Sequence, residues 1–189
     1  AWMETRMWRI AELEADPDLD PARIIGAARE LTDDAARAYA REALGRYAGD
    51  VSGLSLEDVI ACLPDESHDP LRIAARFGVD PGLVFRRFAA LSAEVTRAGQ
   101  VFGLIGCGDN GRVLFRKLPK GVTMSSDAAP DLLWPLYRAL DAPLVPAWHG
   151  VTTPEGAFRL CAYATIAQSP TIGGPPEREA WMLVIPDGK

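Results

Sequence analysis

The segment from Val101 to Lys117 constrains the fold of this chain more than any other part of it. It holds two β-rich runs, VFGLIG and RVLFRK, on either side of Asp109-Asn110-Gly111. An Asn-Gly pair accepts positive φ at both central positions of a type I′ turn, the turn that joins two strands tightly. The pattern therefore predicts a β-hairpin, and with it an antiparallel sheet in this half of the chain.

The first hundred residues instead show helical spacing of apolar side chains. Three Asp-Pro pairs supply an N-cap followed by proline at the first helical position. A helix-turn-helix pattern is predicted over 69–95, with its turn at Gly78. The expected helices are Trp2–Ala15, one after Asp20-Pro21, Ala35–Tyr47 capped by Thr32, Ser55–Cys62, one after Asp69-Pro70 and one after Asp80-Pro81.

After Gly99 the spacing changes from helical to strand-like. Strands are predicted at 101–106, 111–117, 158–167 and 180–186, a helix at 131–140, and loops at 119–130, 142–157 and 169–178. The sequence thus predicts an α+β protein with a helical module over 1–98 and an antiparallel sheet domain over 99–189. A helix on one face of that sheet would resemble the arrangement of PAS and GAF sensors.

Composition excludes several classes of protein. The net charge is −6, and the acidic excess lies in residues 1–100, so non-specific nucleic-acid binding is not expected. No apolar run reaches the length of a membrane span, and no signal peptide is recognisable, so we expect a cytoplasmic protein without membrane contact. Three widely spaced cysteines, Cys62, Cys107 and Cys161, fit buried thiols in a reducing compartment.

Enzymatic chemistry finds little support in the sequence. The two histidines, His68 and His149, are far apart, and the cysteines have no short ligand spacing, so no metal site is predicted. No Gly-x-Ser-x-Gly elbow is present, and the glycines near Asn110 lie in a hairpin turn rather than between a strand and a helix. We therefore expect no catalytic residues and no cofactor.

A basic cluster and an aromatic helix are the candidate binding elements. The cluster comprises Arg112, Arg116, Lys117 and Lys120, and alternation would place Arg112 and Arg116 on one face and Lys117 on the other. These side chains could hold a phosphate or a carboxylate, or could simply protect a solvated strand edge. The helix carries three residues that could wall an apolar site or belong to the core: Leu133, Trp134 and Tyr137.

The helix-turn-helix pattern leaves a second interpretation open. Arg86 and Arg87 on its second helix could contact phosphates or a guanine edge in DNA. Residues 69–97 carry only two more basic than acidic side chains. A helical hairpin that packs against its neighbours, with its arginines in solvent, explains the same pattern.

The chain resembles short-chain fatty acyl-CoA regulators, which are bacterial transcription factors of the XRE type. The resemblance spans about residues 55–186. It is carried by the hairpin from Asp109 to Lys117, by the helix Leu133-Trp134-Pro135-Leu136-Tyr137-Arg138-Ala139-Leu140, and by the stretch His68–Val79 with Arg86–Leu91. The last stretch also resembles a segment of ImmA/IrrE-type peptidases, so an inactive peptidase-related scaffold is a further alternative.

The resemblance implies a ligand-sensing region that binds a short-chain acyl-CoA or a related anionic metabolite. It assigns phosphate or carboxylate contacts to the basic strand and the walls of the site to the aromatic helix. It also implies a homodimer, with the helical half as candidate dimer surface, and DNA binding through a domain absent from this chain. Asp131 replaces a cysteine of the family, which puts in doubt the iron–sulfur cluster that some relatives hold.

Overall fold

The structure is a computed structural model of the 189-residue chain. It describes residues 2, 6, 8–66, 69–91, 101–119, 122, 129–154, 156–167 and 176–187, with only the backbone described at 63–66, 129–132 and 167. The chain forms two compact units, residues 1–91 and residues 92–189. Each unit has its own hydrophobic core.

The first unit is helical, as its spacing of apolar residues predicts. The described helices are α2 (Ala11–Ala15), α3 (Pro21–Ala27), α4 (Asp34–Gly53), α5 (Leu56–Glu66), α6 (Pro70–Phe77) and α7 (Pro81–Ala90). Asp20, Asp69 and Asp80 each accept hydrogen bonds from backbone N–H groups of the helix that follows, so the three predicted Asp-Pro helix starts are confirmed. Gly78 ends α6 in the left-handed conformation, with φ 64°.

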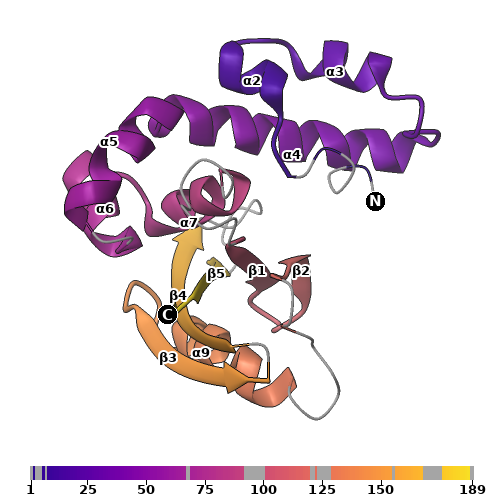
Figure 1. Cartoon of the computed structure of the whole chain (residues 1–189). Helices are drawn as coiled ribbons and strands as arrows, with labels where there is room; N and C mark the ends of the chain where they lie inside the picture. Colours follow the sequence, from indigo (N-terminus) through magenta and orange to yellow (C-terminus); the bar gives the residue numbers. More distant parts are fainter. Residues whose placement is uncertain are drawn as a thin grey trace. The chain divides into compact units, whose positions relative to one another are not determined.

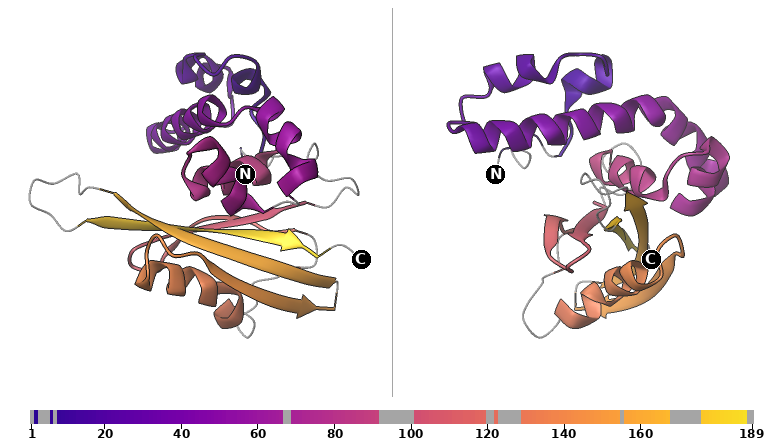
Figure 2. Two further views of the ribbon diagram at one scale, coloured as in Figure 1. Left: turned by 90° about the vertical axis from the view of Figure 1, so that its left-hand side faces the viewer. Right: turned by 180° about the vertical axis from the view of Figure 1, so that it is seen from behind.

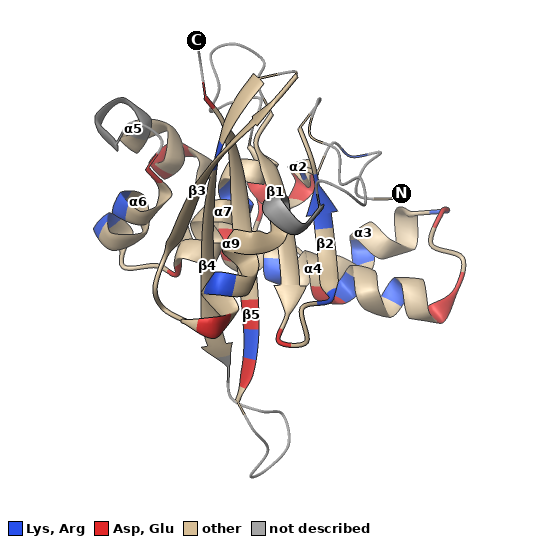
Figure 3. Ribbon diagram, turned by 90° about the horizontal axis from the view of Figure 1, so that it is seen from below, with Lys and Arg blue, Asp and Glu red and all other residues tan. Residues whose placement is uncertain are grey.

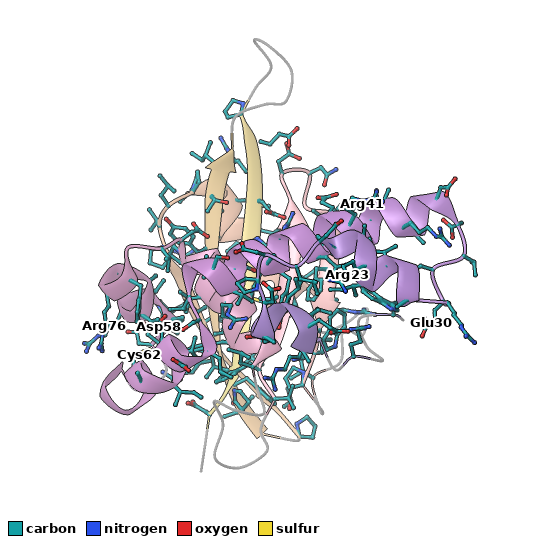
Figure 4. All side chains as sticks on the ribbon, turned by 90° about the horizontal axis from the view of Figure 1, so that it is seen from above. Arg23, Glu30, Arg41, Asp58, Cys62 and Arg76 are labelled. Carbon is teal, nitrogen blue, oxygen red and sulfur yellow. The ribbon has the colours of Figure 1, made fainter. Side chains whose placement is uncertain are left out.

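Some helix boundaries differ from the prediction. The N-cap of α4 is Asp33 rather than Thr32, and the helix continues through Gly45 and Gly49. Trp8 has φ 65°, which interrupts the helix expected over residues 2–15. At the start of α5, the Ser55 hydroxyl accepts from the Asp58 N–H and donates to the Asp58 carboxylate. Figure 4 shows Asp58 and Cys62 on this helix.

The second unit is built on a five-stranded antiparallel sheet. Its strands are β1 (Gly103–Gly108), β2 (Val113–Lys117), β3 (Ala147–Thr153), β4 (Gly156–Ala167) and β5 (Glu177–Pro186), and the helix α9 (Ala129–Asp141) follows β2 in the chain. The strand order is β2-β1-β5-β4-β3, which places β5 at the centre and β2 and β3 at the two edges (Figure 1).

One face of the sheet is covered by α9, as Figure 2 shows. Leu133, Leu136 and Leu140 of the helix pack with the alternate strand residues that point to this face. Those strand residues include Ile105, Cys107, Leu160, Ala162, Ala180, Met182 and Val184. An α+β protein with a helix on one face of an antiparallel sheet is therefore confirmed.

The hairpin at the start of the sheet forms, but with a different turn. The Gly111 N–H donates to the Gly108 carbonyl at 2.9 Å, and only Gly111, at φ 74°, takes the left-handed conformation in the loop. A turn followed by one left-handed glycine is the three-residue loop with a bulge, not the predicted two-residue type I′ turn. The register of β1 and β2 also shifts between Gly106 and Cys107, which leaves one extra residue on β2.

The edge strand β3 lies within a predicted loop. Pro143, Pro146 and Gly150 favoured a loop over residues 142–157, yet Ala147–Thr153 pairs with β4 without interruption. The segment WHGVTT contains β-branched and aromatic residues, which favour a strand, and the loop prediction did not take them into account. Pro146 stands just before the first residue of the strand, where it removes no hydrogen bond from the ladder.

Candidate functional site

Tyr137 of α9 contacts the β1–β2 hairpin, and these are the two elements that the sequence predicts as candidate binding elements. A Cβ atom placed on Gly111 would lie 3.2 Å from Cε1 of Tyr137, so the ring lies directly on the β1–β2 turn. Glycine at this position is therefore required for two reasons: it adopts the left-handed backbone conformation without strain, and it leaves room for the aromatic ring. The contact brings the predicted basic hairpin and the predicted aromatic helix together.

The three predicted apolar residues of α9 divide between its two sides. Leu133 is buried in the core between helix and sheet. Trp134 is 56% exposed and Tyr137 is 41% exposed. Because residues three apart share a side of a helix, the two aromatic side chains form one surface beside the hairpin. Leu133 lies on the core side of the helix and is not part of this exposed surface.

The basic residues of β2 also divide, here between the two faces of the sheet. Arg116 pairs with Ile105, whose side chain belongs to the core under α9, so Arg116 lies on the α9 face and is exposed. Lys117 pairs with Leu104 on the opposite face and is buried. Figure 3 shows the basic end of β2 beside α9. The structure thus separates Lys117 from the predicted anion contacts.

Arg112 follows Gly111 directly and is exposed. Its N–H donates to the Asn110 side-chain oxygen at 2.9 Å, which fixes the backbone at the end of the turn. The extra residue on β2 breaks the alternation between Arg112 and Arg116, so the prediction that these two residues share a face is wrong. Arg112 instead lies at the turn end of the hairpin, next to the residue that Tyr137 contacts.

Among the described cationic side chains of the sheet unit, Lys117 is the one whose pKa clearly departs from its ordinary value. Burial lowers the pKa of its ammonium group from 10.5 to about 8, because a buried charge loses its hydration.

Arg86 and Arg87, the predicted DNA contacts, lie in ion pairs within the helical unit. Arg86 makes two hydrogen bonds of 2.7 Å to Asp50. Arg87 is 1% exposed, and it donates to both carboxylate oxygens of Glu14 and to the Leu54 carbonyl. Both side chains therefore have structural roles. Arg86 links α7 to α4, and Arg87 links α7 to α2 and to Leu54, the residue that follows α4.

The residue types that commonly bind metal ions, His, Cys, Asp and Glu, do not gather into a ligand cluster in the described part of the chain. Cys62, Cys107 and Cys161 are free cysteines and are buried, as expected. Across the described residues, no group of three or more His, Cys, Asp or Glu side chains could hold a metal ion. His68, Lys120 and the side chain of Asp131 lie outside the described residues.

Among the helices that the structure describes, none combines the length and the apolar character needed to cross a membrane. No protein-family model matches the chain, and no curated protein matches it.

Among solved structures, the chain is similar to a transcriptional regulator of Mycobacterium tuberculosis, with 21% sequence identity and a TM-score of 0.65. The match covers 88% of this chain and 50% of that chain, so this chain spans about half the length of the regulator. At this identity the likeness shows a shared fold, which extends over both the helical and the sheet unit.

Proposed function

We propose that this chain is the ligand-sensing region of a bacterial transcriptional regulator and that it binds a short-chain acyl-CoA or a similar anionic metabolite. The observation that carries the proposal is the contact of Tyr137 with the turn at Gly111, since it places the aromatic surface of α9 against the hairpin that carries Arg112 and Arg116. The fold shared with a regulator supports the same class of function.

The chemistry of the surface fits such a ligand. Arg116 and Arg112 are exposed guanidinium groups, which bind phosphate and carboxylate oxygens through paired hydrogen bonds. Trp134 and Tyr137 offer aromatic faces on which an adenine ring or an acyl chain could lie. An acyl-CoA carries phosphates, a purine and an acyl thioester in one molecule, and so would use both kinds of contact.

Regulation would follow from a difference in affinity between two states of the chain. A ligand shifts such an equilibrium only as far as it binds one state more tightly than the other. The state favoured by the ligand would then alter DNA binding through a further domain of the protein. Regulators of this kind usually act as dimers on paired half-sites, and we propose a homodimer here as well.

Thermal unfolding with and without ligand tests the proposal. Acetyl-CoA and propionyl-CoA should raise the melting temperature of the chain, because a ligand that binds only the native state stabilises it. Arg116→Ala should reduce the shift, whereas Arg76→Ala, which removes an exposed arginine from α6 (Figure 4), should leave it unchanged. The absence of a shift with any acyl-CoA in a panel of chain lengths would contradict the proposal.

A further inference from the structure

The outer edge of β3 has the features of a strand that pairs with another chain. It is one of the two edges of the described sheet, and its seven residues, AWHGVTT, include no Lys, Arg, Asp, Glu or Pro. Natural edge strands are normally protected by such residues or by bulges. The opposite edge follows that rule, since β2 carries an extra residue, Arg116 and Lys117.

Gly150, at the middle of β3, is not explained by the fold of the chain. A Cβ atom there would have nothing within 4 Å, and its φ lies outside the left-handed region that favours glycine. Its pairing with Arg159 on β4 is regular, so the glycine does not mark a bulge. Glycine weakens a strand interior, and where neither bulge nor bend requires it, it often marks the close approach of another backbone.

We propose that β3 pairs antiparallel with β3 of a second copy about a two-fold axis at Gly150, which joins the two sheets into one. This interface differs from the helical surface expected from the sequence and does not depend on the ligand. Charge favours a second copy at this edge, because like charges placed opposite each other destabilise a strand pair. Two β2 edges would oppose arginines and lysines, whereas two β3 edges oppose none.

The two-fold axis fixes which residues meet. Gly150 faces the partner's Gly150, and Trp148 faces the partner's Thr152. Trp148, Leu144 and Val145 are 41%, 58% and 57% exposed, so an apolar line continues past the N-terminal end of the strand. Strand pairing would supply main-chain hydrogen bonds, and these side chains would supply the apolar contacts beside them.

Cysteine cross-linking of the chain tests this register. Gly150→Cys should give a covalent dimer under mild oxidation, because residues directly opposite in an antiparallel pair have Cα atoms within disulfide range. Thr152→Cys alone should give none, since the two copies of this position lie on either side of the axis. Trp148→Cys combined with Thr152→Cys should restore the cross-link. The native cysteines are buried, so the unsubstituted chain serves as the background control.

Sedimentation equilibrium gives an independent measure. The unsubstituted chain should be a dimer, and Gly150→Lys should shift it to monomer by placing two ammonium groups opposite each other. Ala61→Lys, at an exposed position of α5, should leave the dimer intact. A chain that stays monomeric at high concentration, a dimer unaffected by Gly150→Lys, or cross-linking that is as efficient at Thr152→Cys as at Gly150→Cys would each overturn the proposal.

Discussion

Gly106 on β1 lies against the indole ring of Trp181 on β5. A Cβ atom at this position would come within 2.8 Å of Cζ3 of the tryptophan, whose ring also lies 6.0 Å from that of Phe115. The absence of a side chain at Gly106 therefore lets Phe115 of β2 and Trp181 of β5 pack across β1 on the face opposite α9.

Gly106→Ala should destabilise the fold by about 1–3 kcal/mol, because the added methyl group must displace a buried ring. Gly108→Ala is the matched control on the same strand, since its Cβ would meet its nearest neighbour at an ordinary 3.6 Å. Chemical denaturation monitored by circular dichroism measures both. Equal effects of the two substitutions would argue against the packing described for Trp181.

Glu14 is held ionised by its partners in the helical unit. Burial alone would raise its pKa, but the hydrogen bonds from Arg87 and Tyr47 together outweigh burial and hold the pKa below 4.5. A carboxyl group with a lowered folded-state pKa stabilises the fold above its unfolded-state pKa and loses that contribution as the pH falls through the folded-state value.

Arg87→Met should cost about 3–5 kcal/mol of stability, because it leaves the Glu14 carboxylate buried without its cation. Glu12→Gln, which removes the exposed pair with Arg6, should cost less than about 1 kcal/mol. Both values follow from denaturant titrations at neutral pH. A small effect of Arg87→Met would show that the ion pair is not the link between α2 and α7.

Lys117 predicts a distinct pH dependence of stability. Its pKa is lowered from 10.5 to about 8 in the folded chain, so between these values the unfolded chain binds a proton that the folded chain does not. This group alone therefore contributes stability that increases as the pH rises from about 8 to 10.5 and does not change below that range. Burial raises the pKa of the Cys107 thiol from 9.0 to about 11, which lowers stability over part of the same range. Lys117→Met should therefore make stability fall more steeply with pH above about 8 than in the unsubstituted chain, and identical profiles would contradict the assignment.

At the scale of secondary-structure elements, α9 packs one side against the sheet and places the proposed binding residues Trp134 and Tyr137 on its exposed side. Leu136 is fully buried in the core, so Leu136→Ala should destabilise the chain by about 2–5 kcal/mol. Trp134→Ala changes an exposed residue and should alter stability by less than about 0.5 kcal/mol, yet it should weaken acyl-CoA binding. Thermal unfolding and ligand titration of the same two variants separate the roles. A large loss of stability in Trp134→Ala would show that this side chain contributes to the core rather than to an exposed binding surface.

Local signals predicted the elements that depend on local chemistry. The Asp-Pro caps, the left-handed Gly78 and the apolar spacing of α9 act within a turn or two of the chain, so the sequence reveals them. The turn at Gly111 was predicted only in outline, because Asn-Gly suits both a two-residue loop and a loop with a bulge. The strand β3 was missed because its pairing with β4 outweighs the nearby prolines.

The candidate site depends on contacts between distant residues that could not be predicted from the sequence. The contact of Tyr137 with Gly111 joins residues from different elements and follows from the docking of α9 on the sheet. The extra residue on β2 likewise changes the face of Arg112 without leaving a signature in the sequence. The basic and aromatic character of the site could be predicted, but the exclusion of Lys117 from it required the observed burial.

At the scale of the whole molecule, the chain consists of two units with separate cores. All of the proposed ligand contacts lie in the sheet unit, whereas the buried ion pairs of Arg86 and Arg87 lie in the helical unit. Under the proposed function, recognition of the metabolite would therefore take place in the sheet unit.

Calorimetric titration of propionyl-CoA into the chain tests the central claim most directly. We expect saturable binding that Arg116→Ala and Trp134→Ala each weaken by about 10-fold or more, as loss of a charge-assisted or aromatic contact predicts, with Arg76→Ala unchanged. Binding that is absent, or that survives both substitutions at full strength, would contradict a ligand site formed by α9 and the β1–β2 hairpin.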